Sequence, residues 1–334
     1  MSEFARIIEN HFSRKRIVIV GDSVADQFLR GTIARVSREA PVFILRHDDT
    51  ETFPGGAANA AVNVASLGAT AVLIGLIGTD SNGEALLEKL RDAKVDCAYL
   101  VSAAHLRTTT KVRVLAGQHY APRQQVIRID YENQAETDES LKEKLRANLS
   151  RAAENADAIV VSDYNYGVAD EKLVELARRI SAEKQIPLLI DSRFRLKDFA
   201  NATTATPNQD EVEQILGGNF SFADCDNLRA QLGLEALLVT RGNKGMLLAE
   251  KDRTPLEIKA VGSTEPVDVT GAGDTVIAVY ALGLACGLSF ADSARLANYA
   301  GGIVVMKKGT ASVQTAELLA AIKKVSKESA VPKK

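Results

Sequence analysis

Short runs of aliphatic and β-branched residues alternate with longer amphipathic segments along this chain. The short runs are apolar at successive positions, which indicates strands buried on both faces. We expect such strands at Ile17–Val20, Val72–Ile77, Ala158–Ser162, Leu188–Asp191 and Leu237–Thr240. We expect helices at Ala57–Leu67, Gly83–Ala93, Leu141–Ala153, Glu171–Glu183, Glu211–Leu216, Asp224–Leu232, Asp274–Cys286, Phe290–Val305 and Thr315–Lys324. This alternation predicts an α/β fold with a mainly parallel central sheet covered by helices on both faces.

Two stretches, residues 31–52 and 108–131, contain β-rich runs with no helix between them. We expect them to pair as a small antiparallel appendage beside the main sheet. Two ordinary hairpin insertions would give the same pattern, but a β lid over a ligand site is the interpretation we favour. No linker rich in Pro, Gly or Ser divides the chain. We therefore expect a single domain over residues 1–334 that carries this lid.

Composition narrows the class of protein. The 334 residues are 46% hydrophobic and 25% charged, with a formal net charge of -2, so no global field recruits nucleic acid or membrane. The three cysteines are scattered, which favours a reducing compartment over a disulfide framework. The first 16 residues lack an apolar signal core, and no run approaches the roughly 20 apolar residues that span a bilayer. We expect a cytoplasmic protein.

The most informative motif is Asp268-Val-Thr-Gly-Ala-Gly-Asp-Thr275, at the start of an apolar helix. Small residues at a helix N-terminus direct backbone N–H groups and a partial positive charge at one spot, which favours an anion. Asp274 stands beside that spot as a proton acceptor. The helix terminus should keep the pKa of Asp274 low. An anion cradle next to an acid suits phosphoryl transfer to a hydroxyl group.

A second glycine motif is Pro54-Gly-Gly-Ala-Ala-Asn59, whose glycines permit a ligand to approach the backbone. Asn59 and Asn63 lie one turn apart on the same helix face. Their alignment indicates hydrogen bonding to a polyol, and the alternative is that nearby backbone satisfies both amides. Asp22 and Asp26 follow the first strand, where open α/β sheets bind ligands. Hydrogen bonding to sugar hydroxyls and a role as helix caps are equally compatible with these acids.

Two further motifs each allow a ligand-binding interpretation and a structural one. Asn208 and Glu211 are three residues apart at a helix start, where their oxygens suit hydrated Mg²⁺; taken alone, a capping box is favoured. Residues 240–245, Thr-Arg-Gly-Asn-Lys-Gly, suit a nucleotide phosphate or a hairpin turn. A Walker A loop and a dinucleotide fingerprint are both missing from the sequence, which disfavours a dehydrogenase.

In this order, the motifs resemble those of the ribokinase-like (PfkB) carbohydrate kinases over nearly the whole chain. The resemblance narrows to the heptose 7-phosphate kinase branch, which acts in ADP-heptose synthesis for lipopolysaccharide. It is carried by Val36–Val42, Pro54–Gly68, Gln124–Asp130 and Ser162-Asp163-Tyr164. Some members carry a nucleotidyltransferase domain, and we expect none within these residues. Two segments depart from the branch: Tyr166-Gly167 stands where a Lys-Gly pair is usual, and Asp191-Ser-Arg-Phe194 where Asp-Pro-Lys-Gly is usual.

The resemblance implies an ATP- and Mg²⁺-dependent sugar kinase and a role for each matching residue. Asp274 would be the catalytic base, beside an anion hole of Gly271, Ala272 and Gly273. The substrate would meet Asp22, Asp26, Gly55, Gly56, Asn59, Lys111, Arg113 and Arg128, the three cations serving an acceptor phosphate. ATP would meet Asn208, Glu211, Thr240, Gly242, Gly245 and Asn298. Glu211 would bind Mg²⁺ through water and Asp268 a monovalent cation such as K⁺.

The resemblance also implies a homodimer formed through the lid. Another hexose, pentose or nucleoside remains an open alternative for the acceptor. A non-catalytic sugar or nucleotide sensor on the same fold is a further alternative, but the intact cradle and Asp274 argue against it.

Overall fold

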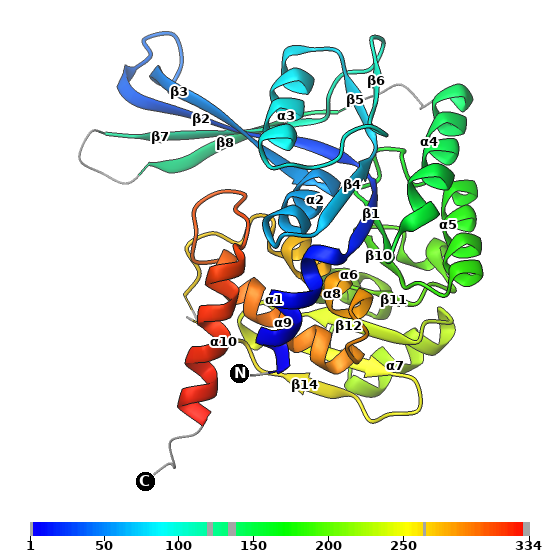
Figure 1. Ribbon diagram of the computed structural model, residues 1–334. Coiled ribbons are helices and arrows are strands. Elements are labelled where there is room, and N and C mark those ends of the chain that lie inside the picture. The colour runs from blue at the N-terminus through cyan, green and yellow to red at the C-terminus, as the bar shows by residue number, and fades with distance from the viewer. Residues whose placement is uncertain (1–2, 119–122, 133–137, 263–264, 330–334) are drawn as a thin grey trace.

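An eight-stranded sheet forms the centre of the molecule (Figure 1). The computed structural model describes residues 3–118, 123–132, 138–262 and 265–329. The strand order is β14-β13-β12-β11-β10-β9-β1-β4, and every pair from β4 to β12 is parallel, whereas β13 and β14 add an antiparallel edge. The strands are β1 (Arg16–Gly21), β4 (Thr70–Ile74), β9 (Ala158–Asp163), β10 (Leu188–Ser192), β11 (Thr204–Ala205), β12 (Ala236–Thr240), β13 (Met246–Glu250) and β14 (Leu256–Ile258).

Helices cover both faces of this sheet, as the uninterrupted apolar strands predict. Along β1, Ile17 and Ile19 belong to one hydrophobic core, while Val18 and Val20 belong to the other. The first core contains residues of α1 (Glu3–His11), α2 (Ala57–Ser66), α3 (Ser81–Asp92), α8 (Ala272–Ala285), α9 (Phe290–Val304) and α10 (Thr315–Ser329). The second contains residues of α4 (Glu139–Ala152), α5 (Glu171–Lys184), α6 (Gln209–Leu216) and α7 (Phe222–Gln231). Within the described ranges, no helix combines the length and the apolar character needed to cross a membrane.

A separate four-stranded sheet, which we call the lid sheet, projects from the helical layers (Figure 1). Its order is β3-β2-β7-β8, built from β2 (Ser23–Val36), β3 (Phe43–Gly56), β7 (Thr110–Gly117) and β8 (Gln124–Tyr131). Both predicted lid segments fall in it, although residues 119–122 lie outside the described part. The prediction of an antiparallel appendage was wrong for the central pair, because β2 and β7 are parallel. These two strands are distant in sequence, so no hairpin joins them.

One predicted strand needs correction, and one helix was not predicted. The expected strand Val72–Ile77 is divided at Gly75 into β4 and β5 (Leu76–Gly78), and β5 pairs with β6 (Val101–Ala103) outside the main sheet. A Cβ at Gly75 would lie 2.7 Å from the Gly21 carbonyl oxygen, so the chain turns where only glycine fits. The polar N-terminal segment also forms a helix, α1, which buries Ile7 and Ile8.

Candidate active site

The carboxyl ends of the parallel strands meet at one edge of the central sheet, where ligands bind in open α/β folds. The N-terminus of α8 reaches the same edge and faces the loops that follow β9, β10 and β12. A cleft of about 540 Å³ lies between these elements. Its lining includes Tyr164, Asp191, Arg193, Glu211, Gly273 and Asp274.

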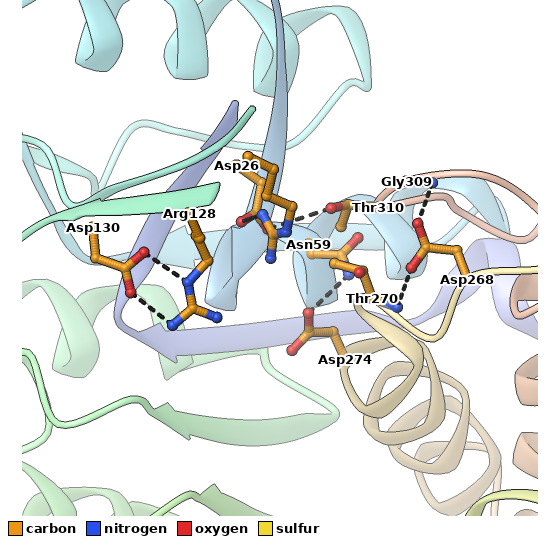
Figure 2. A network of polar contacts seen from close by, with 10 residues as sticks. Asp26, Asn59, Arg128, Asp130, Asp268, Thr270, Asp274, Gly309 and Thr310 are labelled. Atoms are coloured by element: carbon orange, nitrogen blue, oxygen red, sulfur yellow. Dashed lines mark hydrogen bonds and ion pairs between the residues drawn. The ribbon is translucent and has the colours of Figure 1, made fainter. Parts of the chain in front are cut away.

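Asp274 lies in the first turn of α8 and is only 3% exposed. Asn59 Nδ2 donates to its Oδ2 at 2.8 Å, and Tyr164 Oη donates to its Oδ1 at 2.8 Å; Figure 2 shows the contact with Asn59. Burial raises the pKa of Asp274 to about 6, although both hydrogen bonds act to lower it. The prediction of a low pKa was therefore wrong, because the loss of solvation outweighs the helix terminus.

The glycine loop before Asp274 is held in a conformation that needs glycine. Gly271 is the N-cap of α8 with φ of 77°, and a Cβ there would lie 2.5 Å from Asn59 Nδ2. Gly273 has open space around it, and the described residues offer no hydrogen-bond partner for the N–H of Gly271 or Gly273. The N–H of Ala272, in contrast, donates to the Val269 carbonyl at 3.2 Å. The cradle available to an anion is therefore smaller than the three N–H groups we expected.

Asp26 of β2 lies beside this loop and carries an ion pair. Arg113 Nη1 is 2.5 Å from its Oδ1. Thr310 Oγ1 donates to its Oδ2 at 3.3 Å (Figure 2). The neighbouring glycines, which we expect to admit a ligand, also make room for protein groups. A Cβ at Gly55 would lie 2.3 Å from Asp26 Oδ2, and one at Gly56 would lie 2.6 Å from the Asp22 carbonyl oxygen.

Asp22, expected to meet sugar hydroxyls, instead holds the loop that follows β9. The backbone N–H groups of Tyr164 and Tyr166 donate to its Oδ2 at 2.8 and 3.0 Å, and that of Val168 donates to its Oδ1 at 3.2 Å. The residue is 2% exposed, and burial raises the pKa of Asp22 to about 6. A carboxylate enclosed in this way does not face the cleft.

The two asparagines of α2 have different roles, and the prediction that both bind a polyol was wrong for Asn63. Asn63 is fully buried; its amide donates to Asn59 Oδ1 at 3.1 Å, and its Oδ1 accepts from Thr275 Oγ1 and the Val313 N–H. The nearby protein groups therefore satisfy it. Asn59 in turn is committed to Asp274 and the Gly271 carbonyl.

Two cations approach the ring of Tyr164 from different elements. Lys111 of β7 has its Nζ 5.3 Å from the ring centroid of Tyr164 and 5.6 Å from that of Tyr166, and Arg193 has its Cζ 4.8 Å from the Tyr164 centroid. Burial lowers the pKa of Lys111, and the charge of Arg193 lowers it further. In the described part of the chain, neither cation has a carboxylate within ion-pair distance. This pair is thus available to an anion.

The other two predicted phosphate ligands already have partners. Arg113 is paired with Asp26, and its guanidinium lies over the ring of Phe28 at 5.4 Å. Arg128 of β8 donates to both oxygens of Asp130, at 2.9 and 3.0 Å (Figure 2). Neither guanidinium is therefore an unpaired cation in this structure.

Asn208 and Glu211 form a complete capping box at the start of α6. Asn208 Oδ1 accepts from the Glu211 N–H at 2.9 Å, and Glu211 Oε2 accepts from the Asn208 N–H at 2.9 Å. The capping interpretation is confirmed, and Glu211 still lines the cleft, where burial raises its pKa. Among the residues described, no group of three His, Cys, Asp or Glu side chains is arranged to hold a metal ion.

A narrower pocket of about 170 Å³ opens beside the cleft and shares its lining at Thr240, Gly242 and Gly273. The other predicted nucleotide contacts, Gly245 and Asn298, also line it. Residues 240–245 at the same time form the antiparallel turn from β12 to β13 that we considered as the alternative. Asn298 Nδ2 donates to the Lys259 carbonyl at 2.7 Å, so its amide holds one wall of the pocket.

Asp268 joins the glycine loop to the segment after α9. Its two oxygens accept from the backbone N–H groups of Thr270 and Gly309, each at 2.9 Å (Figure 2). Burial opposes ionisation, yet the pKa of Asp268 is lowered because these hydrogen bonds and nearby positive charge outweigh it. The site thus holds a carboxylate in its ionised form.

Tyr164, Asp191 and Arg193 are cleft residues that our site prediction missed. Their signal was present at the carboxyl end of the sheet, since Tyr164 follows β9, Arg193 follows β10 and Asp191 lies in the last two residues of β10. Burial, then the negative charges of Glu211 and Asp274, raise the pKa of Asp191 well above its usual value.

Comparison with known proteins agrees with this architecture. Arabidopsis thaliana ribokinase complexed with ribose and ATP superposes with a TM-score of 0.70 at 20% identity, covering 92% of this chain and 98% of that one. Escherichia coli phosphofructokinase-2 in complex with substrates and products gives a TM-score of 0.75 at 18% identity, covering 93% and 99%. The fold is ribokinase-like.

The sequence comparison places the chain within that fold. The model of the pfkB family carbohydrate kinases matches residues 14–316. The chain belongs to this family of sugar kinases. It is 39% identical over 319 residues to a bifunctional protein HldE of Nitrosococcus oceani and 39% identical over 318 residues to one of Haemophilus influenzae. These matches cover 93% of this chain but only 65% and 64% of those relatives, so the chain spans just under two thirds of their length.

Proposed function

We propose that the chain transfers the γ-phosphoryl group of ATP to a hydroxyl of heptose 7-phosphate. The observation that carries the reaction class is Asp274, buried at the N-terminus of α8 beside the N–H groups of Gly271 and Gly273. The similarity to proteins named HldE and the heptose-kinase motifs support the acceptor. Lys111 and Arg193, which have no carboxylate partner among the described residues, support an acceptor that carries its own phosphate.

The proposed reaction has one proton transfer. The acceptor hydroxyl oxygen forms a bond to the γ-phosphorus, the bond to the β-bridging oxygen of ATP breaks, and ADP leaves. Asp274 orients the hydroxyl and accepts its proton, while the N–H groups of Gly271 and Gly273 stabilise charge on the transferring group. With a pKa of about 6, Asp274 is ionised at neutral pH and is a stronger base than an exposed aspartate.

The nucleotide would enter from the narrow pocket. The apolar part of the nucleotide suits the pocket beside Asn298. The phosphates would then pass Thr240 and Gly242 toward Gly273. Glu211 and Asp191 line the cleft there, a carboxylate set that suits Mg²⁺ held largely by water and nucleotide oxygens. Bound Mg²⁺ would neutralise charge on the phosphates. Asp268, held ionised next to the glycine loop, is the candidate for a monovalent cation such as K⁺.

The acceptor would lie between the glycine loop and the lid sheet. Asp26, oriented by Arg113, offers a carboxylate to sugar hydroxyls. Lys111 and Arg193 would take the phosphate. Arg193 stands in the segment that departs from the heptose-kinase pattern, and Lys111 stacks on Tyr166, the residue at the other departure. These two departures favour, as a second candidate, a pfkB kinase that acts on another phosphorylated sugar.

The assignment is tested by ADP formation with a panel of hexoses, heptoses and their phosphates. We expect turnover with heptose 7-phosphate and much less with the unphosphorylated heptose. Lys111→Met and Arg193→Met should each raise KM for the phosphorylated acceptor about 10- to 100-fold, as expected for a lost charged contact. Arg123→Met, which removes an exposed lid cation paired with Asp48, is the matched control and should leave KM unchanged. Turnover on another sugar alone would overturn the heptose assignment.

We also propose a homodimer formed through the lid sheet. Large apolar side chains are exposed on its strands, among them Phe43 at 60% and Ile127 at 54%. Exposed apolar side chains of this size, clustered on one sheet, are typical of interaction sites. Light scattering should give a dimer mass for the wild type and a monomer mass for Phe43→Asp with Ile127→Asp. A monomeric wild type would contradict the proposal.

A further inference from the structure

Tyr164 contacts Asp274, the proposed base, but has no role in the reaction as described above. It follows β9, and its hydroxyl donates to Oδ1 of Asp274 at 2.8 Å. Among the described residues, Asn59 supplies the only other side-chain donor to this carboxylate, at Oδ2. Both oxygens of Asp274 are therefore oriented, one by α2 and one by the loop after β9.

The position of Tyr164 is constrained from several sides. Its N–H donates to the buried carboxylate of Asp22 at 2.8 Å. Its ring packs against Gly56, where an added Cβ would lie 3.3 Å from Cε2. The charged groups of Lys111 and Arg193 lie over the same ring, at 5.3 and 4.8 Å from its centroid. A side chain held in this way can orient its hydroxyl with little loss of freedom.

The loop that carries Tyr164 is also joined to the loop that carries Arg193. Asp163, next to Tyr164, is buried and accepts from Ser192 Oγ at 2.7 Å and from Arg195. The Arg193 N–H donates to the Asp163 carbonyl at 3.2 Å. Ser192, in the altered segment Asp191–Phe194, and the adjacent Arg195 thus hold the two loops together.

Charged groups near Asp274 raise or lower the pKa of its carboxyl group. Asp26 raises the pKa of Asp274, Arg193 lowers it, and the acids Asp191 and Glu211 line the same cleft. Burial, followed by the charge of Asp274, raises the pKa of Tyr164 well above its usual value, so its hydroxyl stays protonated and donates. The hydroxyl therefore favours the ionised form of the carboxylate at neutral pH.

We propose that Tyr164 is a positioning residue for the phosphoryl transfer: its hydroxyl holds Oδ1 of Asp274 ionised and oriented, and its ring joins the base to the cation pair Lys111 and Arg193. This inference rests on the proposed function, because it takes Asp274 as the base. It predicts that the hydroxyl of Tyr164, a residue that belongs to neither of the two main apolar cores, acts on the base more than on the stability of the fold.

The direct test is a carbon-13 NMR titration of the Asp274 carboxyl group, assigned by its loss in Asp274→Asn. Tyr164→Phe keeps the ring and removes one hydroxyl. Because that hydroxyl lowers the pKa of Asp274, its removal should raise the midpoint by roughly half a unit to one unit. Tyr166→Phe is the matched control, since the Tyr166 hydroxyl donates to Glu132 at 3.0 Å and does not contact Asp274. It should leave the midpoint unchanged.

Kinetics give the second readout. For Tyr164→Phe we expect the acid limb of the kcat profile to move to higher pH by the same amount, with kcat about 10-fold lower and KM for ATP unchanged. An unchanged midpoint in Tyr164→Phe, or an equal change in Tyr166→Phe, would overturn the inference. The NMR result needs no substrate, so this failure is distinct from failure of the proposed function, which full activity of Asp274→Asn would show.

Discussion

Replacing Gly271 with alanine should disturb Asp274, the proposed base, through Asn59 rather than by direct contact. Gly271 has φ of 77°, a conformation that costs an L-residue about 1–2 kcal/mol. The new Cβ would lie 2.5 Å from Asn59 Nδ2 and 2.9 Å from Thr310 Cγ2, so Asn59 must move. Asn59 donates to Asp274 at 2.8 Å, and losing a buried hydrogen bond to a carboxylate costs about 1–3 kcal/mol. The total loss in the free energy of unfolding should be about 2–5 kcal/mol.

Gly273→Ala is the matched control two residues away. No heavy atom lies within 4 Å of its added Cβ, and in a helix alanine is favoured over glycine by about 0.5–1 kcal/mol. Urea unfolding should therefore show Gly271→Ala clearly destabilised and Gly273→Ala equal to or slightly above the wild type. The kcat of Gly271→Ala should fall about 100-fold, as expected when a reacting group is misplaced by about 1 Å. Equal stability of the two variants, or normal kcat in Gly271→Ala, would refute this reasoning.

Two further predictions concern acids of the cleft. Because the pKa of Asp274 is raised to about 6 in the folded protein, the folded state binds this proton more tightly than the unfolded chain, and stability is lost as pH rises from about 4 to 6. Asp274→Asn should therefore be more stable than the wild type at pH 7, by on the order of 1–3 kcal/mol, and no more stable at pH 4. Thermal unfolding at both pH values checks this expectation. A gain in stability that does not depend on pH would contradict it. Glu211→Gln keeps an acceptor for the capping box and should raise the Mg²⁺ concentration needed for half-maximal activity at little cost in stability. Asn208→Ala should instead lose about 1 kcal/mol of stability with the same Mg²⁺ requirement, and interchange of the two outcomes would refute the separate roles.

The central sheet was predictable because its physical signal is local. The strand β1 is apolar at Ile17, Val18, Ile19 and Val20, and its side chains enter two cores in alternation. No local signal distinguishes the parallel pairing of β2 with β7, since the two strands meet only through the tertiary fold. The helix α1 was missed although its apolar residues, among them Ile7 and Ile8, gather on one face, because the segment is short and polar on average.

For the site too, features with a local sequence signal were predictable, and features that depend on the tertiary fold were not. Asp274 and the glycine loop were predictable because the motif itself defines a helix start with glycine at Gly271. The raised pKa of Asp274 was not, because it depends on burial by segments remote in sequence. Asp22 was assigned to the sugar because its position after β1 was known, whereas its partners, three N–H groups of the loop after β9, are visible only in the folded chain.

Asp274 is proposed here as the base of a kinase that phosphorylates heptose 7-phosphate. The most direct measurement compares heptose 7-phosphate-dependent ADP formation by the wild type and by Asp274→Asn, with ATP binding measured on both. We expect turnover by the wild type, a loss of at least about 1,000-fold in kcat for Asp274→Asn, and ATP affinity that is nearly unchanged. Near-normal kcat in Asp274→Asn would contradict the proposed base, and no turnover of heptose 7-phosphate by the wild type would contradict the proposed acceptor.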